Sequence, residues 1–269
     1  GLSSLAQGHR DRPARIASAI VSLPAPYVVH SARCCYNLAR KPPIMNRVRR
    51  EDMPENRFSC ALIGAASFDA DHFSAERFDE VIAVDGGFSS LCAIGVTPDF
   101  ALGDFDSLGH VPQGVPLEKH PVMKDDSDTA LALEWALAHD MREVAVYGAL
   151  GGRLDHTLAT LSALVGAARA GMHAVAVGEG NVVVALAGGM SLEIAAKDAG
   201  TFSVFSAPDE SFGLTERGSL YEVKNATLRN DVTLGLSNEF VGKPVSISLE
   251  RGAVVVVLPR MSLGDIRIG

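Results

Sequence analysis

Residues 144–170 read VAVYGALGGRLDHTLATLSALVGAARA. The first four residues form a short apolar run rich in valine, which is typical of a buried strand. Glycines then cluster at positions 148, 151 and 152, and residues 154–170 are rich in Ala and Leu with helical spacing. A buried strand, a glycine-rich turn and a helix in this order form the repeating unit of an α/β layer.

The same alternation continues on both sides of this unit. We expect further strands at residues 58–66, 80–84, 100–102 and 174–177, and further helices at residues 88–94 and 129–139. Strands that alternate with helices favour a parallel sheet, because parallel neighbours need a long crossover connection. The sequence therefore predicts an α/β fold class, with a Rossmann-like, mostly parallel catalytic domain over residues 56–180.

The helical spacing stops near residue 181. The apolar runs beyond it are short, and several alternate apolar with polar residues: 182–186, 191–194, 201–205, 221–223 and 245–249. Glycine and proline separate these runs, and short strands with frequent turn residues are typical of antiparallel sandwiches. We therefore predict a C-terminal antiparallel β-sandwich domain over residues 181–269.

Residues 1–50 differ in composition from the remainder. They contain nine basic residues and one acidic residue, with several prolines and no sustained periodicity. An Arg-rich, acid-poor composition is typical of an organelle transit segment. The segment can equally be sequence upstream of a start at Met45 or Met53, or a cloning remnant. We expect it to be an N-terminal extension outside the core fold.

Composition excludes several classes of protein. Hydrophobic residues make up 47% and charged residues 21% of the chain, which excludes a mostly disordered protein. Beyond residue 50 there are 15 basic and 31 acidic residues, so we expect no nucleic-acid partner. The apolar run at residues 16–29 is interrupted by prolines and is too short to span a bilayer, so we expect no membrane partner. The four cysteines show no CxxC or paired framework, which favours a reducing, cytoplasmic location and gives no support for zinc.

Acidic residues follow the expected parallel strands at their carboxyl ends, where open α/β sheets bind their ligands. Asp85 follows residues 81–84, and Asp104 and Asp106 follow residues 100–102. In an extended chain, Asp104 and Asp106 point to the same side. An isolated Asp-x-Asp is often a solvated turn, but the recurrence of carboxylates favours a hard-oxygen site for Mg²⁺.

A second acidic cluster, KDDSDT at residues 124–129, precedes the expected helix at residues 129–139. Ser127 or Asp128 can cap that helix. A cap needs one such residue, whereas this cluster has three acids in four positions. Because backbone N–H groups at a helix N-terminus attract anions, the cluster is suited to hold a metal-bound phosphate.

The glycine-rich turn at residues 148–152 lets the backbone approach a phosphate, and Arg153 offers a bidentate fork for its oxygens. Asp155 can cap the helix, orient Arg153 or contribute to a metal site, and the neighbouring His156 has either a structural or a catalytic role. The turn matches neither the P-loop nor the GxGxxG pattern. Carboxylates at several strand ends with one arginine suit phosphoryl or diphosphoryl transfer. Acyl transfer would need a GxSxG elbow, which the sequence lacks.

Together these motifs resemble the thiamine pyrophosphokinase family in identity and order. The matching residues are Asp85-Gly86-Gly87, Pro98-Asp99, Gly103-Asp104-Phe105-Asp106-Ser107, Asp125 through Thr129, Gly152-Arg153-Leu154-Asp155-His156 and Gly235-Leu236-Ser237-Asn238-Glu239. The resemblance covers about residues 58–265. It implies an α/β catalytic domain, a β-sandwich domain, and a homodimer whose thiamine site is shared between subunits.

The resemblance also implies a reaction, in which the diphosphate of ATP passes, with Mg²⁺, to the hydroxyl of thiamine and leaves AMP. The implied metal ligands are Asp85, Asp104, Asp106 and Asp128, and the implied catalytic residues are Asp104, Asp106, Asp128, Arg153 and Asp155. The implied ATP- and substrate-binding residues are Asp85, Gly86, Gly87, Lys124, Asp125, Ser127, Thr129, Gly152, His156, Ser237 and Asn238. Family members often place an aromatic side chain of the second domain over thiamine, and Phe240 is the candidate after Asn238.

Three other functions are compatible with these residues. A related diphosphokinase would use the same carboxylates on another hydroxyalkyl heterocycle, such as a pterin. A phosphatase would use Asp104 as a nucleophile and form an aspartyl-phosphate. A non-catalytic sensor would bind thiamine or a nucleotide without turnover.

Overall fold

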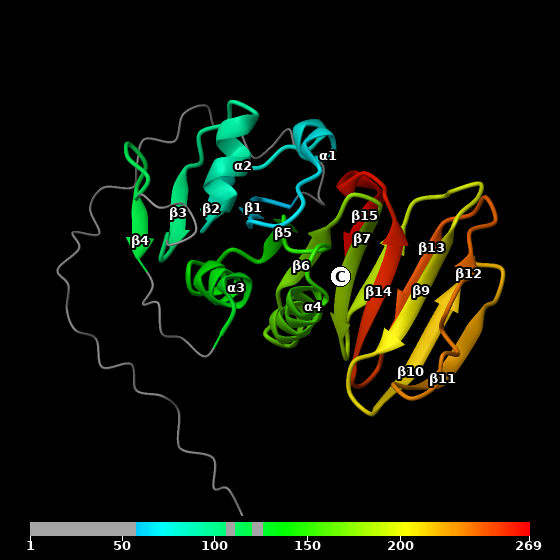
Figure 1. The fold of residues 1–269 in the computed structure, drawn as a ribbon. Helices are drawn as coiled ribbons and strands as arrows, with labels where there is room; N and C mark the ends of the chain where they lie inside the picture. Colours follow the sequence, from blue (N-terminus) through cyan, green and yellow to red (C-terminus); the bar gives the residue numbers. More distant parts are fainter. Residues whose placement is uncertain (1–57, 106–110, 120–125) are drawn as a thin grey trace, which may run out of the picture. The chain divides into compact units, whose positions relative to one another are not determined.

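The computed structural model of the protein describes residues 58–105, 111–119 and 126–269 (Figure 1). These residues belong to one compact unit. The expected extension at residues 1–50 lies outside the described residues, as do the predicted site residues Asp106, Lys124 and Asp125.

Within the described residues, ten strands form the larger sheet, in the order β12-β9-β14-β7-β6-β5-β1-β2-β3-β4. One half of it is parallel and consists of β1 (Cys60–Ile63), β2 (Glu80–Val84), β3 (Phe100–Gly103), β4 (Leu117–Lys119), β5 (Glu143–Tyr147) and β6 (His173–Val177). The other half is antiparallel and consists of β7 (Asn181–Ala187), β9 (Thr201–Ser206), β12 (Asn238–Glu239) and β14 (Ala253–Pro259). The sheet is continuous at residue 180, because β7 pairs with β6.

Helices cover both faces of the parallel half. They are α1 (Ala70–Ala75), α2 (Gly87–Ala93), α3 (Asp128–Ala138) and α4 (Leu154–Arg169). Along β1, Ile63 shares a buried cluster with residues of α1 and α2, whereas Leu62 shares one with residues of α3 and α4. Successive strand residues point to opposite faces, so β1, β2, β3, β5 and β6 are mainly apolar. This explains why these five strands could be identified from sequence, whereas the edge strand β4, with the sequence Leu-Glu-Lys, was missed.

A second, antiparallel sheet packs on the antiparallel half of the first. Its strand order is β11-β10-β13-β8-β15, with β8 (Ser191–Ile194), β10 (Glu210–Arg217), β11 (Val223–Arg229), β13 (Val245–Ser248) and β15 (Ile266–Ile268). A short 3₁₀ helix, η3 (Leu263–Asp265), precedes the last strand. Phe202 and Val256 of the large sheet share a buried cluster with Leu214 and Ile247 of the small one. The predicted fold class, α/β with an antiparallel sandwich, is confirmed.

One predicted strand was misplaced, and others were missed. Tyr221 and Glu222 lie outside any strand, because β11 begins only at Val223. The sequence interpretation did not identify β10 or β14, although residues 254–257 of β14 are four consecutive valines. β14 is an inner strand of the large sheet, between β9 and β7, where both of its faces are buried.

Candidate active site

Two predicted aspartates lie next to each other at the carboxyl edge of the parallel sheet. Asp85 follows β2 and Asp104 follows β3, and these strands pair in register at Val84 and Leu102. The backbone N–H of Asp85 donates a hydrogen bond of 2.7 Å to the carbonyl of Leu102. A Cβ atom on Gly103 would lie 3.0 Å from the Cα of Asp85. Glycine at this position therefore allows the two acidic turns to approach each other closely.

The backbone of both turns adopts left-handed conformations that few non-glycine residues take. Asp85 has φ 47° and Phe105 has φ 62°. Phe105 is buried with 2% of its surface exposed, whereas its neighbour Asp104 is half-buried. The phenylalanine thus anchors the turn and keeps the adjoining carboxylate at the sheet edge. Strained backbone held in place by packing is typical of functional sites.

The turn between Asp85 and α2 depends on an even closer contact. Gly87 begins α2, and a Cβ atom at this position would lie 1.7 Å from the carbonyl oxygen of Ile63 in β1. Only glycine allows the start of α2 to pack this closely on the end of the neighbouring strand. Gly87 and the preceding Gly86 therefore shape the edge on which Asp85 lies.

The cluster before α3 contains a helix cap. The Ser127 hydroxyl accepts a hydrogen bond of 3.3 Å from the backbone N–H of Ala130, so Ser127 is the residue that caps α3. Asp128 and Thr129 occupy the first turn of the helix and are half-buried. Because Ser127 supplies the cap, the helix does not require Asp128 for this purpose.

The loops after β1 and β5 lie against each other at the same edge. The N–H of Gly64 donates to the carbonyl of Tyr147 at 2.8 Å, and the N–H of Ala66 donates to the carbonyl of Gly148 at 2.7 Å. Gly148 has φ 60°, and a Cβ atom on it would lie 2.4 Å from the carbonyl oxygen of Gly64. Beyond this contact, Gly152 has φ 67° and is exposed, so its backbone is open to a ligand.

Arg153 and Asp155 form a bidentate ion pair at the start of α4. Arg153 Nε lies 3.1 Å from Asp155 Oδ1, and Nη2 lies 2.6 Å from Oδ2. The hydrogen bond from Arg153 lowers the pKa of Asp155, and the same bond raises the pKa of Arg153. Asp155 Oδ1 also accepts a hydrogen bond from the backbone N–H of the exposed His156 at 3.0 Å. Of the roles open to Asp155 from sequence, the structure shows the orientation of Arg153.

The Ser-Asn pair lies at the opposite end of the large sheet from the aspartates. Ser237 is exposed with φ 57°, and its N–H donates to the Ser203 hydroxyl at 3.0 Å. Asn238 begins β12, which is separated from β2 by seven inter-strand spacings. At ~4.8 Å for each spacing, the two strands are roughly 34 Å apart. One chain therefore does not bring Asn238 to Asp85.

The expected aromatic residue was wrong. Phe240 is buried, with 3% of its surface exposed, and its ring centroid lies 5.0 Å from that of Phe202 in the sandwich core. The exposed aromatic side chain beside Asn238 is Tyr221, which has 60% of its surface exposed. Asn238 Oδ1 accepts a hydrogen bond from the Tyr221 N–H at 3.0 Å, and Asn238 Nδ2 donates to its carbonyl at 2.9 Å. No local sequence pattern indicates these hydrogen bonds between the Asn238 side chain and the Tyr221 backbone.

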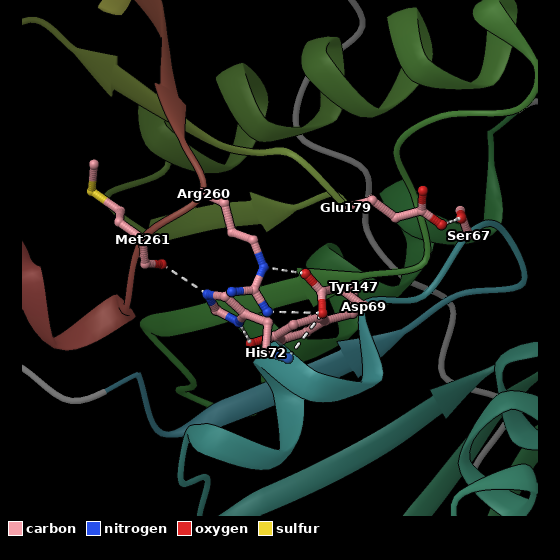
Figure 2. A network of polar contacts seen from close by, with 7 residues as sticks. All are labelled: Ser67, Asp69, His72, Tyr147, Glu179, Arg260 and Met261. Carbon is pink, nitrogen blue, oxygen red and sulfur yellow. Dashed lines mark hydrogen bonds and ion pairs between the residues drawn. The ribbon is translucent and has the colours of Figure 1, made fainter. Parts of the chain in front are cut away.

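A network that sequence reasoning also missed fixes the loop after β1 (Figure 2). Asp69 caps α1 through the His72 N–H at 2.9 Å and accepts from Arg260 Nε at 2.6 Å. The hydrogen bond from Arg260 lowers the pKa of Asp69. The neighbouring Ser67 donates a hydrogen bond to Glu179, which follows β6. These contacts tie the loop to residues distant in sequence.

The donor chemistry of the aspartate edge fits a hard divalent cation. Asp85 and Asp104 present carboxylate oxygens from adjoining strands, and such oxygens suit Mg²⁺. Among residues 58–105, 111–119 and 126–269, no three His, Cys, Asp or Glu side chains gather as a complete metal-binding group. The predicted ligand Asp106 lies outside these residues.

Comparisons with known proteins agree on one family. Residues 74–176 match the family model "Thiamin pyrophosphokinase, catalytic domain". Thiamine pyrophosphokinase of Bacillus subtilis (strain 168) is 26% identical over 182 residues, covering 65% of this chain and 85% of that protein. The solved structure of the B. subtilis protein has a TM-score of 0.65 at 22% identity, covering 75% of this chain and 99% of that one. A thiamin pyrophosphokinase family protein from Enterococcus faecalis gives 0.63 at 25% identity, covering 76% and 100%.

A membrane-spanning helix was not expected from the sequence. Over the described ranges, no helix is long and apolar enough to cross a membrane.

Proposed function

We propose that the chain, which is similar to the thiamin pyrophosphokinase family, transfers a diphosphate group from ATP to the hydroxyl of thiamine. The products are thiamine diphosphate and AMP. The observation that carries the proposal is the position of Asp85 and Asp104, which follow the neighbouring strands β2 and β3 at one edge of the sheet. The Gly148 turn and Arg153 come after β5 at the same edge. That edge is where open α/β sheets bind phosphates.

Four aspartates would hold Mg²⁺ in this enzyme: Asp85, Asp104, Asp106 and Asp128. The bound cation neutralises phosphate charge, which an acidic protein with a formal charge of −8 cannot do alone. Arg153 binds phosphate oxygens, and its guanidinium is held in place by Asp155. The exposed backbone at Gly152 lets the triphosphate approach without steric conflict. Lys124, Asp125, Ser127, Thr129 and His156 are proposed as further contacts to ATP and substrate.

The reaction is an in-line displacement. The thiamine hydroxyl oxygen forms a bond to the β-phosphorus of ATP as the bond from that phosphorus to the α,β-bridging oxygen breaks. The bridging oxygen leaves with AMP, and the hydroxyl proton passes to the carboxylate of Asp128. A primary alcohol is a weak nucleophile, so positioning of both substrates contributes much of the acceleration.

We propose that thiamine binds between two copies of the chain. Asn238 and Asp85 are roughly 34 Å apart along the sheet of one chain, so a site that uses both needs a second subunit. The partner would contribute Ser237 and the ring of Tyr221. Exposed apolar side chains support an interface near these residues: Leu220, Val232, Leu234 and Leu236 are 48–65% exposed. The free thiols Cys60 and Cys92 support a reducing, cytoplasmic location.

The direct test is incubation of the purified protein with ATP, Mg²⁺ and thiamine, with quantification of AMP and thiamine diphosphate. Equimolar products that disappear with EDTA support the proposal. A requirement for a pterin in place of thiamine would indicate a diphosphokinase that acts on pterins. Phosphate release that does not depend on thiamine would indicate a phosphatase. Saturable thiamine binding without product would indicate a sensor.

The shared site has its own test. The Asp104→Asn variant is expected to be inactive, and the double variant Ser237→Ala, Tyr221→Ala is expected to show almost no activity at a thiamine concentration near the wild-type KM. When the two are mixed and allowed to exchange subunits, half of the dimers contain one intact site. Activity should therefore recover to about one quarter of the wild-type value. No recovery, despite exchange shown by mass spectrometry of labelled chains, would contradict a shared site.

A further inference from the structure

A buried carboxylate lies behind the Ser-Asn motif. Glu216 in β10 has 3% of its surface exposed, and its Oε2 accepts a hydrogen bond of 2.7 Å from Asn238 Nδ2. Burial raises the pKa of Glu216, while the hydrogen bond from Asn238 acts in the opposite direction. A buried carboxylate costs stability unless its contacts compensate. Its position therefore indicates a role besides packing.

The hydrogen bonds of Asn238 show what that role requires. Its Nδ2 group lies 2.7 Å from Glu216 Oε2, 3.1 Å from the Ser219 hydroxyl and 2.9 Å from the Tyr221 carbonyl. Its Oδ1 atom accepts from the N–H groups of Tyr221 at 3.0 Å and Glu239 at 2.9 Å. Four of these five contacts, all except the one to the Ser219 hydroxyl, depend on one orientation of the amide.

Glu216 helps to select that orientation, together with the backbone groups of Tyr221 and Glu239. With the amide reversed, Asn238 Oδ1 would face the Glu216 carboxylate, and Nδ2 would face two backbone donors. The hydroxyl of Ser219 can adapt to either orientation by rotating, because it both donates and accepts. An ionised carboxylate can only accept a hydrogen bond, so it excludes the reversed amide.

The orientation of Asn238 in turn determines where Tyr221 lies. Asn238 binds both backbone polar groups of Tyr221, whereas the tyrosine side chain is 60% exposed. The neighbouring Leu220 N–H donates to the Glu239 carbonyl at 3.0 Å, and Ser219 forms a β-bridge with Phe240. The loop between β10 and β11 is thus held against β12, with the aromatic ring pointing outward.

We propose that Glu216 is a positioning residue for the substrate ring, which acts by fixing the Asn238 amide and through it the Tyr221 backbone. This inference rests on the proposed function, in which Tyr221 of one subunit contacts the thiamine bound at the aspartates of the other. Glu216 itself touches no substrate. Its removal should therefore affect thiamine binding and leave the ATP site of the α/β half unchanged.

The test compares Glu216→Leu, which removes the acceptor, with Glu216→Gln, which keeps an acceptor oxygen of the same shape. Glu216→Leu should raise KM for thiamine by roughly 10- to 100-fold, the effect of losing a hydrogen bond to a charged group. KM for ATP should stay within about twofold. Glu216→Gln should recover most of the thiamine affinity. Ser211→Ala is the matched control, because Ser211 is a buried, hydrogen-bonded residue on the same strand, away from Tyr221.

A double variant separates positioning from general destabilisation. In a Tyr221→Ala background, Glu216→Leu should have no further effect on KM for thiamine, because the residue through which it acts is absent. An unchanged KM in Glu216→Leu, equal losses for both substrates, or full additivity with Tyr221→Ala would each overturn the inference. If the wild type makes no thiamine diphosphate, the proposed function fails first. Calorimetric titration with thiamine then decides: wild-type binding weakened by Glu216→Leu supports the inference, and absence of binding overturns it.

Discussion

His72→Ala should destabilise the protein more than any exposed substitution in the network of Figure 2. His72 has 3% of its surface exposed, with Nδ1 3.0 Å from the Tyr147 hydroxyl and Nε2 2.8 Å from the Met261 carbonyl. The Met261 carbonyl oxygen can only accept a hydrogen bond, so Nε2 carries a proton and donates it to Met261. In the tautomer with its single ring proton on Nε2, Nδ1 accepts from the Tyr147 hydroxyl.

The magnitude follows from the two partners that the substitution leaves behind. Each buried polar group without a partner costs about 1–3 kcal/mol, and loss of the packed ring adds to this. We therefore expect the free energy of unfolding to fall by about 3–5 kcal/mol and Tm to fall by roughly 6–20 °C. Arg260→Ala is the control. Its side chain is 45% exposed where it pairs with Asp69, so its loss should cost much less than that of His72.

The assay is urea unfolding followed by circular dichroism, with calorimetry for Tm. A double-mutant cycle with Tyr147→Phe isolates the bond between Nδ1 and the phenol, for which we expect a coupling of about 1–2 kcal/mol. A loss below about 1 kcal/mol in His72→Ala would refute the reasoning. So would strict additivity of the two substitutions, because the hydrogen bond would then contribute nothing.

Three further predictions concern other parts of the fold. Gly87→Ala should lower the free energy of unfolding by about 2–3 kcal/mol in urea titrations, because its Cβ would lie 1.7 Å from the Ile63 carbonyl oxygen. Gly166→Ala in α4 is the control: its Cβ meets nothing within 4 Å, so this change should be neutral or stabilising. Arg153→Lys loses the bidentate fork, so kcat should fall about tenfold or more and the pKa of Asp155, followed by NMR, should rise toward its ordinary value. For Glu216, burial raises the pKa above the ordinary 4.5, so the stability this carboxyl contributes is present below pH 4.5 and is lost as the pH rises through the raised pKa. Glu216→Gln should consequently gain stability relative to wild type as the pH is raised, and a constant difference across that range would contradict the assignment.

The sequence predicted those parts of the fold whose signals are local. The β5 strand, its glycine turn and α4 could be placed to within about one residue, because a strand buried on both faces is apolar throughout. The aspartates after β2 and β3 could be identified because they follow such strands directly. The strand expected at residues 221–223 was wrong because Tyr221 is exposed and is held by a side chain, not by a strand neighbour.

Features that depend on contacts between distant residues had no comparable signal. The burial of Phe240 against Phe202 follows from sandwich packing, which a sequence window around the Ser-Asn motif does not contain. The network at His72 joins positions 75 and 189 residues apart. Pairing of β6 with β7 makes the sheet continuous across residue 180, where the end of the helical spacing indicated a boundary.

This continuity explains how the two halves of the proposed site divide its chemistry. A ten-stranded sheet holds the phosphate-binding edge and the Ser-Asn edge at a fixed separation, so motion within one chain is a poor way to close a distance of roughly 34 Å. In the proposed dimer, a second copy would close it without deforming either sheet. The aspartates would then be arranged by local turns within one subunit, whereas Glu216, Asn238 and Tyr221 would arrange the substrate ring from the other. Substitutions of the aspartates should therefore lower kcat, because these residues act in diphosphate transfer. Substitutions of Glu216, Asn238 or Tyr221 should raise KM for thiamine, because these residues act in substrate binding.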